Sequence, residues 1–192
     1  MSRTTCAAWS RWSGGSASGV TSGSFIMVTL GQGLGTCVVD HGHAVTGASG
    51  AAGLSQWTQT FDADGVPRPG GSLLTTPAVL DRCTAAGLPR DPELLIRLAE
   101  SGDARALEVA GWTAGRLAPL LATMVNLTDP ELILLGGELS PLLTPVVDDL
   151  AADLVGLVAP FQSHIPIHIA DWDLGDWARG AAVIALQELL RT

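Results

Sequence analysis

The hydrophobic pattern of the chain first becomes regular at residues 25–30 (FIMVTL), an apolar run typical of a buried strand. A glycine-rich segment at 31–36 follows directly, and residues 37–39 form a second short apolar run. The Asp, Gly and His residues at 40–43 have the composition of a hairpin turn, which leads into a third run at 44–46. Three consecutive strands joined by short turns predict an antiparallel meander.

Two segments differ in composition from the rest of the chain, and the first of them, residues 1–23, shows neither helical nor strand periodicity. Residues 1–23 are rich in Ser, Gly and Thr, so we expect a poorly ordered tail, with the folded domain at residues 24–192. Residues 47–72 are dominated by Gly, Ala, Ser, Pro and Asp. This composition predicts a long surface loop, a kind of segment that often carries function.

The second half of the chain alternates between helical and strand patterns. Asp91-Pro92-Glu93 has the N-cap and first-turn proline of a helix start, and apolar residues after Asp103 recur every three or four positions. The expected helices lie at 77–87, from 91, at 103–126, 141–158 and 176–190, and the expected strands at 132–135 and 165–169. A meander followed by this alternation predicts an α/β fold, a mixed sheet with helices on both faces.

Composition narrows the class of protein. The 192 residues are 47% hydrophobic, enough for one ordinary domain core. Charged residues interrupt every long apolar stretch and the start lacks an apolar signal segment, so we expect a cytoplasmic protein without a membrane partner. The three cysteines, Cys6, Cys37 and Cys83, are odd in number and far apart, which argues against a disulfide framework.

The charge distribution argues against two further classes of site. The formal net charge is −9, and all ten basic residues are arginines scattered along the chain. Binding to a nucleic-acid backbone requires concentrated positive charge, so we expect no nucleic-acid contact by this segment itself. The absence of lysine also excludes a GxxxxGK[ST] nucleotide loop.

Three glycine motifs are the strongest candidates for a binding site. Glycines let the backbone approach a phosphate and present its N–H groups, so Gly31-x-Gly33-x-Gly35 is an anion-binding candidate, with a plain tight turn as the alternative. A second motif, GASGAAG, ends the meander at residues 47–53. The third, at 136–137, follows the predicted strand 132–135 at its carboxyl end, where open α/β sheets bind ligands.

These motifs together resemble a known family. Residues 25–53 (FIMVTLGQGLGTCVVDHGHAVTGASGAAG) look like the glycine-rich signature of ROK proteins (repressor, open reading frame, kinase). The segment MVNLTDPELILLGGELS resembles their later Pro-Glu, apolar strand and Gly-Gly motif, and DLGDWARGAAVIAL is similar to the start of their last helix. The resemblance implies the second lobe, at 24–192, of an actin-like ATPase (ribonuclease H-like) fold. Such proteins bind a sugar and, in the kinases, ATP between two lobes.

The resemblance also implies roles for particular residues. The phosphate loop of the second lobe would consist of Gly31, Gly33, Gly35 and Thr36. Gly136 and Gly137 would lie beside the adenosine of a nucleotide, and Gly50 and Gly53 would shape the turn that brings sugar-contacting residues into the cleft. ATP and Mg²⁺ would be the cofactors of a kinase form. The oligomeric state stays open, although the family is commonly dimeric and the resemblance therefore includes a homodimer as one alternative.

The sequence departs from the family at its polar positions. The family usually has Glu-x-Gly-His after the GAAG turn, where this chain has Leu54-Ser55-Gln56-Trp57. A cysteine-rich zinc cluster is expected downstream, but residues 66–72 contain no cysteine, so we expect no zinc. The pairs His41/His43 and His164/His168 have no third metal ligand near them in sequence, so we predict no metal site.

The missing carboxylate bears most directly on activity. Phosphoryl transfer to a sugar usually needs an aspartate that accepts the hydroxyl proton, and in the family that residue lies upstream of the glycine loop. Residues 1–39 contain neither Asp nor Glu, so we assign no catalytic residue. The main hypothesis is the sugar-sensing part of a transcriptional regulator, truncated and without catalytic activity alone. The alternatives are a fragment of a glucokinase-like, ATP-dependent sugar kinase and a truncated remnant.

Overall fold

A computed structural model of the protein describes residues 23–170. The predicted tail at 1–23, apart from Gly23, and the predicted last helix at 176–190 lie outside the described residues.

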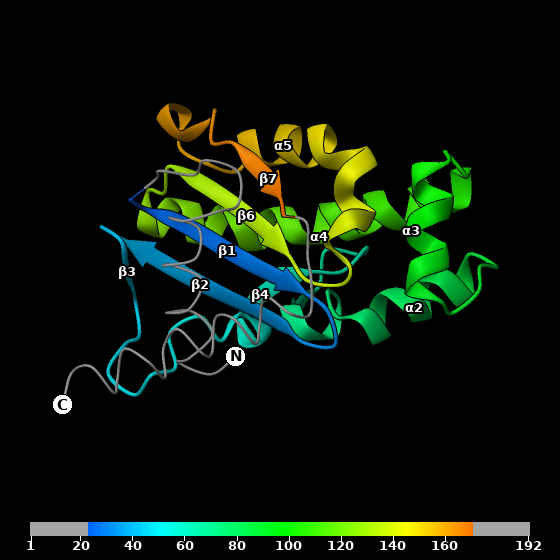
Figure 1. The fold of residues 1–192 in the computed structure, drawn as a ribbon, viewed down its shortest axis with the longest axis horizontal. Helices are drawn as coiled ribbons and strands as arrows, with labels where there is room; N and C mark the ends of the chain where they lie inside the picture. Colours follow the sequence, from blue (N-terminus) through cyan, green and yellow to red (C-terminus); the bar gives the residue numbers. More distant parts are fainter. Residues whose placement is uncertain (1–22, 171–192) are drawn as a thin grey trace.

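The centre of the fold is a five-stranded mixed sheet in the order β3-β2-β1-β6-β7 (Figure 1). β1 (Phe25–Leu30) pairs antiparallel with β2 (Leu34–Asp40), which pairs antiparallel with β3 (His43–Ala44). On its other side β1 pairs parallel with β6 (Leu132–Gly136), and β6 pairs parallel with β7 (Ile167–Ile169). The predicted meander and mixed sheet are therefore confirmed.

The helices of the described residues belong to one hydrophobic core, which they form with one face of the sheet. Two of them begin at aspartate caps: Asp91 Oδ1 accepts the Leu94 N–H at 2.9 Å, and Asp103 Oδ1 accepts the Ala106 N–H at 3.1 Å. The helical elements are α2 (Thr76–Ala85), α3 (Pro92–Glu100), α4 (Ala104–Thr128), α5 (Val147–Val155) and the 3₁₀ segments η1 (Ser55–Trp57), η2 (Gly70–Ser72), η3 (Ser140–Val146) and η4 (Pro160–Gln162).

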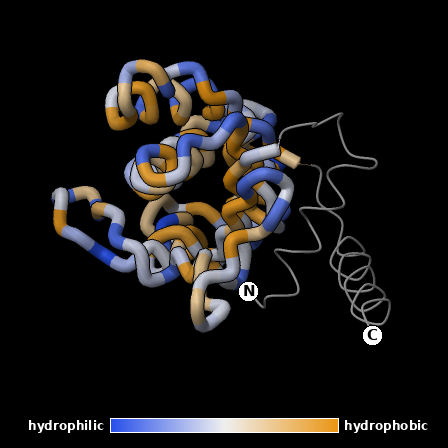
Figure 2. The backbone as a smooth tube through the Cα atoms, turned by 90° about the vertical axis from the view of Figure 1, so that its left-hand side faces the viewer, coloured by the Kyte–Doolittle hydropathy of each residue, from blue (hydrophilic) through white to orange (hydrophobic). Residues whose placement is uncertain are grey.

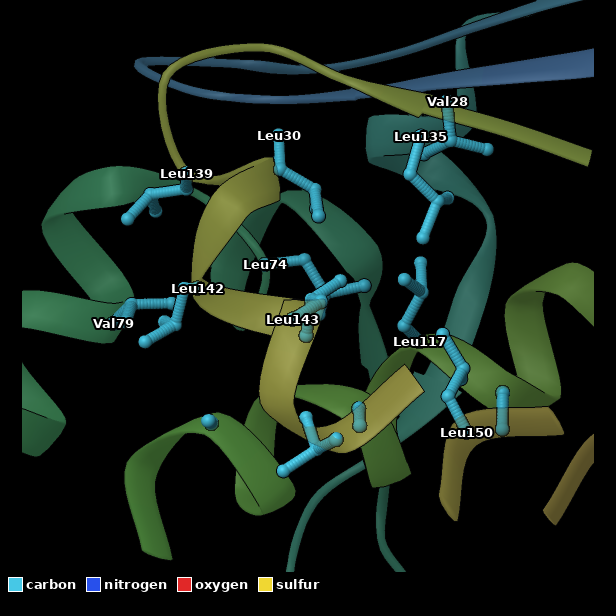
Figure 3. Packing of buried hydrophobic residues seen from close by; sticks show 14 of the residues in the cluster. Val28, Leu30, Leu74, Val79, Leu117, Leu135, Leu139, Leu142, Leu143 and Leu150 are labelled. Carbon is cyan, nitrogen blue, oxygen red and sulfur yellow. The ribbon is translucent and has the colours of Figure 1, made fainter. Parts of the chain in front are cut away.

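Strand alternation separates two hydrophobic clusters. Val28 and Leu30 of β1 face the larger cluster, which Figure 3 shows with leucines of α4 and η3. Phe25 and Met27 face the smaller cluster on the opposite side, together with Cys37 and other residues of β2 and β6. Figure 2 shows that the hydrophobic segments gather toward the interior of the molecule. Because β1 and β6 are buried on both faces, their sequences are continuous apolar runs.

The segment 47–72 lies largely at the surface, as predicted, but it is not a loop throughout. The segment contains η1, a two-stranded antiparallel sheet of β4 (Gln59–Phe61) and β5 (Pro67–Pro69), and η2. Thr60 is buried and its hydroxyl donates to the carbonyl of Arg116 in α4 at 2.5 Å. Gly70 is packed so closely that a Cβ there would lie 2.8 Å from a Leu34 methyl group. The segment is ordered because it docks on α4 and β2.

Several element boundaries also differ from the prediction. β2 begins at Leu34 rather than at 37, and the third strand is His43–Ala44 rather than 44–46. The helix expected at 141–158 is divided into η3 and α5, since Pro141 and Pro145 lack the N–H groups that a regular α-helix would use. No helix within residues 23–170 combines the length and apolar character needed to cross a membrane.

Candidate functional site

The predicted glycine motifs lie around one end of the central sheet. β1 and β6 run in the same direction, and their carboxyl ends lie where α2 begins (Figure 1). β2 starts at this end, because it returns from β1 through a short hairpin. Ligands of open α/β sheets bind at this edge, so the topology brings the three predicted glycine motifs to the end of the sheet where such folds bind ligands.

The glycine hairpin has a loop of three residues, Gly31-Gln32-Gly33. Gln32 and Gly33 are exposed, and a Cβ placed on Gly33 would have no atom within 4 Å. The carbonyl of Gly31 accepts the N–H of Thr76, the first residue of α2, at 2.7 Å. One side of the loop is therefore anchored to a helix start and the other side is open.

The remaining two residues of the predicted phosphate loop are not in the loop. Gly35 and Thr36 lie within β2 and are buried, opposite Thr29 and Val28 of β1. The Thr36 hydroxyl donates to the carbonyl of Gly53 at 2.9 Å. The structure thus separates the predicted set into two loop glycines and two strand residues.

The second motif forms the turn that packs on β2. Gly50 and Gly53 have φ angles of +72° and +84°, a backbone region that favours glycine. A Cβ on Gly53 would overlap the carbonyl oxygen of Thr36, and the Thr36 N–H donates to the Gly53 carbonyl at 3.2 Å. Gly53 consequently allows the turn to lie directly against the start of β2.

The third motif packs against the end of β1. Gly136 is the last residue of β6 and pairs with Thr29, whereas Gly137 has a φ of +94°. A Cβ on Gly137 would overlap the carbonyl oxygen of Leu30 and lie 2.9 Å from its carbonyl carbon. The same Leu30 carbonyl accepts the Leu139 N–H at 3.1 Å, and Figure 3 shows the two leucine side chains directed into the core.

A contact that sequence reasoning missed joins the glycine loop to both neighbouring segments. Glu138 Oε1 accepts hydrogen bonds from Gln32 Nε2 at 3.0 Å and from Thr76 Oγ1 at 2.5 Å. We call these three residues the Glu138 junction. Thr76 is buried, while Gln32 and Glu138 are exposed. The sequence signals were the Thr-Pro start of α2 and an acidic residue directly after the glycine pair, but nothing in the pattern connects them.

The segment that replaces the family's Glu-x-Gly-His forms η1 beside β2. Ser55 is buried, whereas Leu54 and Trp57 are exposed, the Trp57 side chain by 70%. Gly71 packs on Gln56, where an added Cβ would lie 3.1 Å from the Gln56 Cβ. The turn after Gly53 therefore presents an indole ring, not a carboxylate.

The histidine pair His41/His43 lies at the β2–β3 turn, at the other end of β2 from the glycine loop. His41 Nδ1 lies 2.8 Å from Asp40 Oδ1, and His43 Nδ1 lies 2.9 Å from the His41 carbonyl. A hydrogen bond from Ser24, with a smaller contribution from His41, holds the pKa of Asp40 below its ordinary value. Within residues 23–170 no three His, Cys, Asp or Glu side chains are grouped to hold a metal ion.

Solved structures show the same fold. A ROK hexokinase from Thermus thermophilus is 22% identical, with a TM-score of 0.70 over 99% of this chain and 65% of its own. A ROK glucokinase from Streptomyces griseus, solved with glucose and AMPPNP, is 20% identical, with a TM-score of 0.74 over 96% and 67%. A ROK transcriptional regulator described as a homologue of the E. coli MLC protein is 19% identical, with a TM-score of 0.76 over 94% and 50%.

These similarities confirm the predicted actin-like ATPase fold, and the chain spans between half and two thirds of the length of these three structures. No curated protein sequence matches the chain. The family model described as "ROK family" matches residues 4–188, nearly the whole sequence. The chain therefore belongs to the ROK family.

Proposed function

We propose that this chain is the sugar-sensing part of a cytoplasmic transcriptional regulator of carbohydrate metabolism and does not phosphorylate the sugar that it binds. The observation that carries the proposal is the turn after Gly53, which presents the exposed ring of Trp57. An indole combines a large apolar face with an N–H donor, so it can stack on the apolar face of a sugar ring. It cannot accept the hydroxyl proton that phosphoryl transfer releases.

The surroundings of the glycine loop agree with a binding role. The turn at Gly53 and the segment at Gly137 are each held against backbone carbonyls, which gives this end of the sheet a rigid frame. The carboxylate beside the loop, Glu138, already accepts two hydrogen bonds from the protein's own side chains. Rigid support of this kind is what a ligand-binding site requires.

Sugar binding is the test of this proposal. Isothermal titration with glucose, mannose and N-acetylated hexoses should give saturable binding of at least one sugar, and Trp57→Ala should weaken it by about tenfold or more, roughly 1.4 kcal/mol. Phe161→Ala is a matched control, since Phe161 is an aromatic residue exposed by 82% on η4. The proposal fails if no sugar binds, or if both variants have the same effect.

The second candidate is an ATP-dependent sugar kinase. The open backbone at Gly33 and the fold shared with a glucokinase solved with glucose and AMPPNP support this alternative. We expect the chain as given to show no hexose-dependent formation of ADP in a coupled assay. Turnover with any of the same sugars that is abolished by Gly33→Leu would favour the kinase over the regulator.

A further inference from the structure

The Glu138 junction points to the kind of ligand that the glycine loop accepts. We propose that Glu138 excludes phosphate groups from this loop, so that the site takes an uncharged ligand and rejects nucleoside di- and triphosphates. This inference deepens the proposed function, because it assigns selectivity for neutral sugars over nucleotides to one side chain.

The first argument is the position of the side chain. A Cβ placed on Gly31 would lie 3.7 Å from Glu138 Cγ and 3.9 Å from its Oε1, so the glutamate side chain lies over the first glycine of the loop. The hydrogen bond from Gln32 fixes the carboxylate from the loop side. The carboxylate therefore lies beside Gly31, the first of the three loop residues, whereas the backbone at Gly33 is open.

The second argument concerns the start of α2. The N-terminus of a helix attracts anions through its free N–H groups and the helix dipole, and this is how many proteins bind phosphate. Here the hydroxyl of Thr76, the first residue of the ten-residue helix α2, donates to the Glu138 carboxylate at 2.5 Å. The protein thus supplies its own anion at the start of α2, whose first N–H donates to the Gly31 carbonyl of the glycine loop.

The glycine loop and the triphosphate of ATP are consequently a poor fit in this chain. A phosphate at Gly31 would displace the two hydrogen bonds to Glu138 and would face its charge at short range. A neutral sugar hydroxyl has no such repulsion and can donate to a carboxylate oxygen. A Mg²⁺ ion that bridges the Glu138 carboxylate and a phosphate through oxygen ligands would remove this repulsion. The titration is therefore run both without and with Mg²⁺.

The experiment compares Glu138→Gln, which removes the charge and keeps the shape, with Glu138→Ala, which removes both. ADP and inorganic tripolyphosphate are the probes, measured by isothermal titration with the full chain, once in EDTA and once with Mg²⁺. Glu131→Gln is the matched control, because Glu131 is an exposed glutamate that precedes β6 at the opposite end of that strand. Circular dichroism confirms that each variant is folded.

We expect both Glu138 variants to bind ADP at least about tenfold more tightly than the unmodified chain in EDTA, with Glu138→Ala the tighter, and Glu131→Gln to be unchanged. If neither variant gains affinity, Glu138 does not exclude phosphate and the inference is wrong. It is also wrong if the unmodified chain binds Mg²⁺–ADP more tightly than Glu138→Gln. Titrating the unmodified chain with sugars keeps the two questions apart, because failure of that chain to bind any sugar would contradict only the proposed function.

Discussion

The close contact between Gly137 and Leu30 makes Gly137→Ala the sharpest test of how this end of the sheet is built. Two separate penalties apply to an alanine there. The φ of +94° lies in a region that costs an L-residue about 1–2 kcal/mol. The new methyl group would also overlap the Leu30 carbonyl, and relieving such overlap in a packed region typically costs about 1–3 kcal/mol.

Two other glycines separate these contributions. Gly65 has a φ of +75° with no atom within 4 Å of an added Cβ, so Gly65→Ala should carry only the backbone penalty, about 1–2 kcal/mol. A Cβ on Gly33 also meets nothing within 4 Å, and Gly33 has no positive φ, so Gly33→Ala should change stability by less than about 0.5 kcal/mol. The expected order of destabilisation is Gly137 well above Gly65, and Gly65 above Gly33.

Equilibrium unfolding in urea, followed by tryptophan fluorescence, measures all three differences. With a urea dependence of ~2 kcal/mol per molar, a loss of ~4 kcal/mol moves the midpoint of Gly137→Ala down by ~2 M. The midpoint of Gly65→Ala should move down by about 0.5–1 M, at most half of that shift. Equal midpoints for Gly65→Ala and Gly137→Ala would refute the argument, because they would mean that the approach to Leu30 imposes no cost of its own.

Three further predictions concern the core and the titrating groups. Leu117 is fully buried in the larger cluster, between Leu135 of β6 and Leu150 of α5 in Figure 3, so Leu117→Ala should destabilise the protein by about 2–5 kcal/mol in the same unfolding assay, and a loss under 1 kcal/mol would contradict the packing. The Ala106 N–H, with a smaller contribution from Arg105, holds the pKa of Asp103 below its ordinary value of 3.8. The ionised Asp103 side chain therefore stabilises the folded protein fully above pH 3.8, and this stabilisation is lost as the pH falls through the lowered pKa. Acid unfolding of Asp103→Asn should accordingly show less dependence on pH over this range than the unmodified chain, and an identical profile would argue against the cap. Burial raises the pKa of the Cys83 thiol, so iodoacetamide should alkylate it slowly in the folded protein and rapidly in urea, as read by peptide mass spectrometry.

The central sheet was predictable because the composition of its strands indicates that they are buried. β1 and β6 are buried on both faces, so every position is apolar or small and the runs are recognisable without any tertiary information. The start of α3 was equally accessible, since the cap at Asp91 is a local interaction with Leu94. In both cases the signal and the structure that it specifies lie within a few residues of each other.

The segment at 47–72 was not predictable for the opposite reason. Its order depends on partners far away in the chain, such as the carbonyl of Arg116, which accepts the hydrogen bond from the Thr60 hydroxyl. Similarly, Gly70 packs against the side chains of Leu34 and Leu120, which leave no room for a side chain at position 70. A polar composition shows that a segment lacks a core of its own. It does not show whether another element supplies one.

Only part of the candidate site could be predicted from the sequence. The glycines could be identified because their spacing is local, and the structure brings their three motifs to one end of the sheet. The Glu138 junction joins positions 32, 76 and 138, and no local pattern links residues so far apart. The part of the site that we propose governs selectivity is therefore the part that only the fold assembles.

The parallel pairing of β1 with β6 has a consequence for how the protein folds. The hairpin of β1 and β2 can form from adjacent residues, whereas Phe25 pairs with Leu132, more than 100 residues away. Closing so long a loop is slow, because its entropic cost precedes the contacts that repay it. The glycine hairpin can thus exist before Gly137 and Glu138 arrive beside it. A ligand that requires both segments recognises only chains that have completed this late step, and its binding would draw the folding equilibrium toward them.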